Sequence, residues 1–415
     1  MQRSDIRAVG DLAGEASTVF TTLVEGVHAG IAGRVFTSIG PTAAPTRIVH
    51  DGLARAIYGG VQRGIRGAAR AAGAVAAELW GDEDHEALES RAGVAEAIAI
   101  VNGLYGDQLA AQDNKLAGNM GIRHRGKPIA PTAEALATAF PAATGRVVVF
   151  LHGWVLTEQS WSRQPRDGDD ARTYGERLHE DAGFTPVYLR YNTGLHVSAN
   201  GRMLADILED LQARWPVRCD ELVLVGHSMG GLVMRSACHY GAQQRHRWTE
   251  MVSHVVCLGS PHLGADIEKG VNIASWALAR LPETRAIAGF LNTRSAGVKD
   301  LRFGACIDED WRDADPDEFL RDRCQEVPFL PEATYHFVAT TAGPPVVGVI
   351  VGDRLVRSKS ASGLGKSRSI PFEREHGLTL TGLHHFDLLN HPVIYAKLRD
   401  WLAVEASAGS ACDHL

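Results

Sequence analysis

The sequence predicts an α/β protein with a mostly parallel sheet that carries helices on both faces. Short runs rich in Val, Leu and aromatic residues, such as RVVVFLHGW and ELVLVGHS, recur from about residue 144 onward. Segments of helical length, such as ANGRMLADILEDLQARW, separate these runs. Strands that are apolar throughout and alternate with helices are typical of a parallel sheet covered on both sides.

The length and the net charge of the chain limit the kinds of protein that it can be. The chain has 415 residues, of which 45% are hydrophobic and 22% are charged, as in an ordinary globular protein. This length favours two or three domains. The net charge of −7 provides no overall attraction to nucleic acid, so we expect no nucleic-acid partner.

Residues 1–143 are expected to form a helical N-terminal extension. In STVFTTLVEGVHAGIAGRVF the apolar residues recur every three or four positions, which predicts one helical stripe. Two further helices are expected after Pro45 and over residues 92–111. The helix after Pro45 has an apolar stripe on one face and Arg63, Arg66 and Arg70 on another. The stripe consists of Leu53, Ile57, Val61, Ile65 and Ala69. This basic amphipathic character admits peripheral contact with a lipid surface. Packing of its apolar stripe on the rest of the protein is the favoured interpretation.

The N-terminus and the cysteines indicate a reducing compartment. MQRSDIRAVGDLAGEAS has acidic residues early and no apolar core, so no signal peptide is predicted. No apolar run reaches about 18 residues, so no spanning helix is expected. We therefore expect a cytoplasmic protein, at most peripheral to a membrane. Cys306 and Cys324 lie in a loop-rich stretch and would pair only in an oxidising compartment.

Residues 144–415 are expected to form the catalytic domain. The strand series continues through TPVYLRYN, SHVVCLGS and TYHFVATT. Between the last two runs lies a long interruption, about residues 266–331, without a strong strand pattern. An insertion of this length is usually a functional lid or binding loop.

The stretch Gly226-His227-Ser228-Met229-Gly230 carries the clearest chemical signal. It has the pattern G-x-S-x-G and lies between a predicted strand and a predicted helix, the context in which such a serine is a nucleophile. Glycines are needed at 226 and 230 because the strand and helix backbones approach each other there. Ser228 is therefore the predicted nucleophile.

A serine nucleophile needs a base, an acid and donors for the oxyanion. His384 and His385, just before the last predicted helix, are both candidates for the base, whereas His391 is interpreted as a structural histidine at the helix start. Asp353 at the end of the apolar run VVGVIVG is the predicted acid. Three other acids compete with it, namely Asp308, Asp310 and Asp387.

The predicted oxyanion donors are the backbone N–H groups of Met229 and Trp154. Met229 directly follows the nucleophile, and Trp154 lies in the loop FLHGW after the first strong strand. Gly153 allows this loop to turn. His152 is expected to support the loop from below and not to act as the base.

These motifs resemble the lipase/esterase branch of the α/β hydrolases that includes the PGAP1-like (GPI inositol-deacylase-like) bacterial proteins. The resemblance covers most of the chain, including VGHSMGGLVMRSACHYG, LGSPHLGA, VGDRLV and HFDLLNHPVIYAKLRDWL. It implies the α/β-hydrolase fold, with Ser228 as nucleophile, Asp353 as acid and His385, rather than His384, as base. The chain departs from the family at Arg354, where glycine is frequent, and at Trp154, which is bulkier than usual.

The leading functional hypothesis is a serine carboxylic-ester hydrolase that acts on hydrophobic esters through an acyl-enzyme. Two alternatives remain, an acyltransferase with the same triad and a non-catalytic lipid- or partner-binding protein with a vestigial core. The mechanism requires no cofactor. No metal site is expected, because His384 and His385 lack the helical i, i+4 spacing of a zinc protease.

Overall fold

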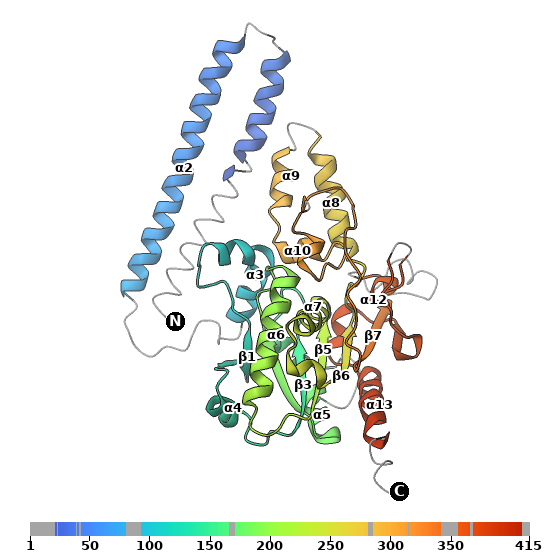
Figure 1. The fold of residues 1–415 in the computed structure, drawn as a ribbon. Helices are drawn as coiled ribbons and strands as arrows, with labels where there is room; N and C mark the ends of the chain where they lie inside the picture. Colours follow the sequence, from blue (N-terminus) through green and yellow to red (C-terminus); the bar gives the residue numbers. More distant parts are fainter. Residues whose placement is uncertain are drawn as a thin grey trace, which may run out of the picture.

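The computed structural model describes residues 21–22, 24–38, 40, 43–79, 93–165, 171–280, 285–313, 315–341, 356–365 and 368–408. Its body is one sheet with helices on both faces, and a long helical hairpin extends beside it (Figure 1). None of the described helices combines the length and the apolar composition needed to cross a membrane.

The sheet has eight strands in the order β2-β1-β4-β3-β5-β6-β7-β8. They are β1 (Gly121–His124), β2 (Lys127–Ile129), β3 (Arg146–Leu151), β4 (Thr185–Arg190), β5 (Glu221–His227), β6 (Val252–Leu258), β7 (Thr334–Thr341) and β8 (Gly377–Thr381). β1 runs antiparallel to β2 and β4, and all other neighbours are parallel. This mostly parallel sheet confirms the predicted α/β-hydrolase fold class.

Strand register brings the carboxyl ends of the central strands together at one edge. Leu151 of β3 pairs with Gly226 of β5, and Leu258 of β6 pairs with His227. Ligand and catalytic residues in such sheets collect outside the carboxyl ends of the strands. The loops that follow β3, β5 and β6 therefore meet where the sequence places its candidate site.

Two apolar cores lie on opposite faces of the sheet. The helices of the body are α4 (Ala133–Ala139), α5 (Tyr174–Ala182), α6 (Val197–Arg214), α7 (Met229–Gln244) and α13 (Pro392–Ala408). Residues of α6 and α7 join Val147, Val149 and Leu151 of β3 in one core, whereas α5 and α13 join Val148 and Phe150 in the other. The alternation of buried β3 side chains between the two cores is the period-two pattern of a strand. The sequence of β3 is apolar without interruption because helices cover both faces of the sheet.

The sheet begins earlier than expected. Residues 1–143 were predicted to be helical, yet β1 and β2 lie in that range and extend the sheet beside β4. The helical prediction is wrong for residues 121–129. These strands have four and three residues, too few for a period-two pattern to stand out, and their turn uses Arg125 and Gly126 with φ of 50° and 81°. The predicted third helix is confirmed as α3 (Val94–Ala111).

The remaining elements lie in the connections between the strands and helices of the body. The interruption between β6 and β7 holds α8 (Asp266–Leu278), α9 (Arg285–Asn292), α10 (Ala296–Asp300) and the 3-10 turn η5 (Asp308–Asp310). Short turns are η3 (Glu158–Ser162), η4 (Arg247–Glu250), α12 (Ser358–Ala361), η6 (Arg374–His376) and η7 (His385–Leu389). Cys306 and Cys324 are both free thiols.

The N-terminal hairpin consists of helical residues 24–38 and of α2 (Ala44–Leu79), which is 36 residues long. The two helices contact each other through His28, whose ring centroid lies 5.1 Å from that of His50, and through Gln62, which donates a 3.1 Å hydrogen bond to Thr22. Val61, a member of the predicted apolar stripe of α2, remains exposed. The expectation that this stripe packs on the rest of the protein is therefore wrong at this residue.

Candidate active site

Ser228 lies at the turn between β5 and α7 with an unusual backbone. Its φ of 55° and ψ of −121° are rare for a residue with a side chain, and such strain persists where the surroundings hold it in place. The Ser228 N–H donates to the carbonyl of Leu258 at 2.8 Å, and its own carbonyl accepts from the N–H of Gly231 at 3.1 Å. The neighbouring strand and the first turn of α7 thus fix the serine at the carboxyl edge.

Glycines on both sides of the serine permit this turn. A Cβ added to Gly226 would lie 2.6 Å from the backbone nitrogen of Gly231. At Gly230 it would lie 2.6 Å from the carbonyl oxygen of Leu151 in β3. Real Cβ atoms essentially never come so close to other atoms. The close approach of the strand and helix backbones that the sequence predicted therefore explains the glycines at 226 and 230.

His385 is buried beside the same turn. A Cβ added to Gly259, which follows β6 with φ of 64°, would lie 3.2 Å from Nδ1 of His385. The ring centroid of His385 is 4.7 Å from that of His227, the residue before Ser228. The structure therefore brings the candidate base to the loops that hold the candidate nucleophile.

His227 links these two residues and stays neutral. Its Nε2 lies 3.1 Å from the carbonyl oxygen of His385, and a carbonyl only accepts, so Nε2–H is the donor. Burial, followed by the proximity of His385, lowers the pKa of His227 well below its usual range. His227 is thus a positioning residue that holds the backbone of His385.

The loop after β3 approaches the serine from the other side. A Cβ on Gly153 would lie 3.0 Å from Cβ of Ser228, so the loop passes directly over the nucleophile. Met229 is fully buried at the first position of α7. Met229 therefore follows Ser228 directly, and the loop that carries Trp154 lies beside the serine.

His152 supports this loop and is poorly suited to be a base. Its Nδ1–H donates to the Gly153 carbonyl at 2.9 Å, and its Nε2 accepts from the Tyr191 N–H at 3.3 Å. The Tyr191 hydroxyl donates to the His152 carbonyl at 2.8 Å. Because burial lowers the pKa of His152 to about 4, the ring remains neutral and occupied on both nitrogens.

The helix α3 anchors the same loop, a role that sequence reasoning missed. The indole N–H of Trp154 donates to the carbonyl of Gly103 in α3 at 2.9 Å. A Cβ on Gly103 would lie 2.4 Å from Val155, and one on Gly106 would lie 1.9 Å from Asn192, so both glycines permit the helix to dock. Two glycines three residues apart within a helical pattern were the available signal.

The candidate acid falls outside the described residues. Asp353 belongs to residues 342–355, which follow Thr341 at the carboxyl end of β7. The competing acids accept hydrogen bonds from other groups. Arg202 forms a bidentate pair with Asp308 at 2.9 and 2.6 Å. Asp310 accepts from backbone N–H groups of residues 306, 307 and 325 at 2.8 to 3.1 Å, and Asp387 accepts from that of residue 384 at 2.8 Å.

The other two histidines make local contacts, His384 through its backbone and His391 through its backbone and its ring. His384 precedes η7 and caps it through its backbone N–H. His391 precedes α13, where its N–H donates to the Tyr174 hydroxyl at 2.8 Å and its Nδ1 accepts from the Val393 N–H at 3.3 Å. These contacts agree with the interpretation of His391 as a helix-start residue.

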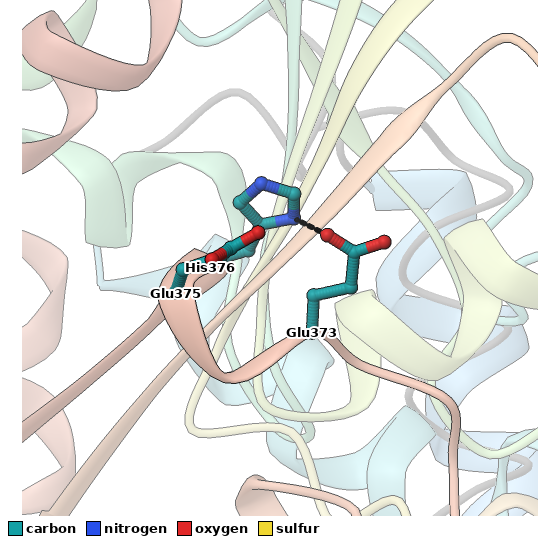
Figure 2. Close-up of side chains that lie close together, drawn as sticks. All are labelled: Glu373, Glu375 and His376. Atoms are coloured by element: carbon teal, nitrogen blue, oxygen red, sulfur yellow. Dashed lines mark ion pairs between the residues drawn. The ribbon is translucent and has the colours of Figure 1, made fainter.

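One group within the described residues has metal-ligating atoms close together. Glu373, Glu375 and His376 offer ligand atoms within 4.8 Å of one another, and Figure 2 shows the ion pair between Glu373 and His376. They lie just before β8, at the amino end of the strand. Because Ser228 lies at the carboxyl edge, a cation bound there would be remote from the nucleophile.

The insertion after β6 carries exposed aromatic side chains. Trp276 of α8 and Phe319 are both partly exposed and stack with ring centroids 4.2 Å apart. The guanidinium of Arg280 lies 3.0 Å from the centroid of the Trp276 ring. The loop 259–264 contacts the base of this insertion, since a Cβ on Gly264 would lie 1.9 Å from the carbonyl oxygen of Arg302.

Comparison with known proteins agrees with the fold. Residues 142–277, from before β3 into α8, match the family model described as PGAP1-like alpha/beta domain. Comparison with curated proteins gives no match.

Solved structures of lipases and esterases are similar at low identity. Mature Bacillus licheniformis lipase BlEst2 is 19% identical over 62% of this chain and 91% of its own, with a TM-score of 0.42. EstA from Clostridium botulinum is 12% identical over 63% of this chain and 87% of its own, with a TM-score of 0.36. Staphylococcus hyicus lipase is 13% identical over 64% and 98%, with a TM-score of 0.35.

Proposed function

We propose that this chain, whose sheet has the α/β-hydrolase fold, is a serine carboxylic-ester hydrolase that acts on hydrophobic esters. The observation that carries the proposal is the strained Ser228 at the carboxyl edge, with His385 buried against the loops that hold it. A serine in this conformation at the start of a helix has no structural need for its hydroxyl, since the cap makes no side-chain hydrogen bond. A half-buried serine beside the loops that hold a buried histidine suits nucleophilic catalysis.

The proposed mechanism follows the serine-hydrolase sequence of steps. His385 takes the proton of Ser228 Oγ as the oxygen attacks the ester carbonyl, and the N–H groups of Met229 and Trp154 bind the oxyanion. His385 returns the proton to the leaving alcohol, which leaves an acyl-Ser228. Water, deprotonated by His385, then releases the acid. Asp353 is proposed to orient His385.

The hydrolase unit is proposed to start at α3 and not at residue 144. α3 binds the candidate oxyanion loop through Gly103, and its carbonyl groups also accept from Ser295 of the insertion. The insertion, about residues 266–331, is proposed to contact the acyl portion of the substrate. Its exposed Trp276 and Phe319 stack supports a hydrophobic ester.

Substitution of the nucleophile tests the proposal directly. The Ser228→Ala variant is expected to lower kcat/KM for p-nitrophenyl esters roughly 10⁴-fold or more, because the remaining site lacks a nucleophile. The measurement is a chain-length series of p-nitrophenyl esters with the wild type and the variant. Fluorophosphonate labelling should disappear in parallel.

Ser253→Ala is a matched control, since Ser253 lies at the amino end of β6 and donates to Glu221 at 2.7 Å. This variant should retain both labelling and turnover. Full ester turnover by Ser228→Ala would exclude the proposal. Product analysis with competing alcohols distinguishes hydrolysis from acyl transfer.

A further inference from the structure

The N-terminal hairpin, defined as helical residues 24–38 together with α2, exposes several apolar side chains. Val24, Ile31 and Val35 are spaced by seven and four residues, so they share one face of the first helix. They are 42%, 51% and 51% exposed. Ile48 at the start of α2 is 71% exposed. A stripe of this kind on a helix usually marks a surface that another body covers.

The second helix of the hairpin presents a basic face. Arg55, Arg63, Arg66 and Arg70 follow at intervals of eight, three and four residues and so align along α2. Three of the four are exposed and Arg66 is half-buried. Gly59 lies on the same face, and an added Cβ there would meet nothing within 4 Å. Exposed guanidinium side chains therefore recur over several turns of this face.

Charge separates this hairpin from the rest of the chain. Residues 21–79 contain six arginines, no lysine and three acidic residues, a net charge of +3. The whole chain carries −7, so the remaining residues carry −10. One of the three acids, Asp51, already pairs with Arg47 at 3.5 Å. The hairpin thus carries a net positive charge within a chain that is negative overall.

We infer that the hairpin docks the protein on the surface of a bilayer that contains anionic phospholipids. Guanidinium groups bind phosphate oxygens in a bidentate geometry, and their long stems cover apolar surface while the charge stays at the headgroups. Exposed Val and Ile side chains enter the headgroup boundary beside them. The helices lie on the bilayer, since no described helix is long and apolar enough to cross it.

A second copy of the chain fits this surface less well than lipid. Pairing two basic faces would bring like charges together, which disfavours association. The hairpin has only three acids to offset six arginines. An anionic bilayer supplies both the complementary charge and the apolar layer that the stripe requires.

The hairpin also adjoins the insertion beside the candidate site. A cavity of about 710 Å³ is lined by Gly30, Arg34 and Arg47 of the hairpin and by Arg285 of α9. Figure 1 shows the hairpin and the helices α8 and α9 extending toward the same side of the body. Docking through the hairpin would bring the insertion close to the bilayer. Docking itself does not depend on the proposed ester hydrolysis.

Vesicle flotation of the full chain tests this inference. Wild type and Ser228→Ala should both float with phosphatidylcholine vesicles that contain about one third phosphatidylglycerol, and neither with phosphatidylcholine alone. The combined change of Arg55, Arg63, Arg66 and Arg70 to Gln should weaken binding to the anionic vesicles at least tenfold. The combined change Ile31→Ser and Val35→Ser should also weaken binding to the anionic vesicles. This loss of affinity should depend less on salt concentration than the loss in the arginine variant.

A matched control removes the same charge elsewhere. It changes four exposed arginines outside the hairpin to Gln, namely Arg125, Arg218, Arg321 and Arg399. This variant should bind like the wild type, and circular dichroism should show equal helix content in all variants. Ser228→Ala lacks the proposed nucleophile, so its flotation measures docking on the bilayer independently of ester hydrolysis.

Three results would overturn the inference. The first is no flotation of the wild type with anionic vesicles. The second is equal flotation of the hairpin arginine variant and the wild type. The third is a dimer in light scattering without vesicles that the hairpin arginine change dissociates, because a second copy would then be the occupant.

Discussion

At the scale of single residues, the indole of Trp154 determines how the candidate oxyanion loop is held. Its N–H donates to the carbonyl of Gly103, and its ring packs against the core on the α6 and α7 face. The next residue, Val155, has φ of 56° and donates its N–H to the Thr193 hydroxyl at 3.3 Å. The bulky side chain at residue 154 thus serves to attach α3.

Trp154→Phe is expected to lower kcat several-fold with little change in KM. The change removes one buried hydrogen bond, worth about 1 kcal/mol, and frees the loop that carries a proposed oxyanion donor. Steady-state kinetics with p-nitrophenyl butyrate measure the effect.

Trp215→Phe is the matched control, because it removes a similar 2.9 Å bond from an indole to the Thr144 carbonyl at the other end of the sheet. Trp215→Phe should lower the free energy of unfolding by a similar amount and leave kcat unchanged. Equal kcat for the wild type and both variants would contradict a positioning role for Trp154.

At the scale of elements, the junction of β5 and α7 tolerates no side chain at its glycines. The carbonyl groups of Leu151 and His152 at the end of β3 lie 2.6 and 2.7 Å from the position that a Cβ on Gly230 would take. Neither backbone can retreat, because β3 is hydrogen-bonded on both sides within the sheet. The geometry of the nucleophile is therefore set by three elements at once.

Gly230→Ala should destabilise the protein by about 1–3 kcal/mol and lower ester turnover strongly, since strand and helix must separate. Gly121→Ala is the control in the same sheet, because an added Cβ at Gly121 would meet nothing within 4 Å. Its effect on the free energy of unfolding should stay below about 1 kcal/mol. Urea denaturation compares the two, and similar losses would contradict the proposed collision.

At the scale of the whole molecule, buried neutral histidines couple stability to pH. Burial lowers the pKa of His152 to about 4 and that of His336 to about 3, and it lowers those of His227 and His262 well below their usual range. In the unfolded chain a histidine titrates near its ordinary value of about 6.5. Between these values the unfolded state binds more protons, so the free energy of unfolding falls as pH decreases.

For each such histidine we expect a loss of about 1.4 kcal/mol between about pH 7.5 and about pH 5.5. The change His336→Gln should reduce the pH-dependent loss by this amount, whatever its effect at neutral pH. Urea denaturation at both pH values provides the measurement. The same pH dependence in variant and wild type would show that folding does not lower the pKa of His336.

Much of the architecture was predictable because its signals are local. The apolar runs of β3 and β5, the helix over 94–111 and the glycines around Ser228 each have their causes within a few residues. The short strands β1 and β2 were missed because their stability comes from pairing with β4, which is distant in sequence. The local pattern of a three- or four-residue strand is too short to indicate it.

The sequence by itself determined the fold class and the residue that sits in the strained turn, because strand periodicity and close backbone contacts demand particular residue types in particular order. Only the tertiary structure decided which residues surround that turn. It placed His385 against His227, turned Trp154 toward α3 and left Arg55, Arg63 and Arg70 of α2 exposed. These outcomes depend on contacts between segments far apart along the chain, and no local pattern records them.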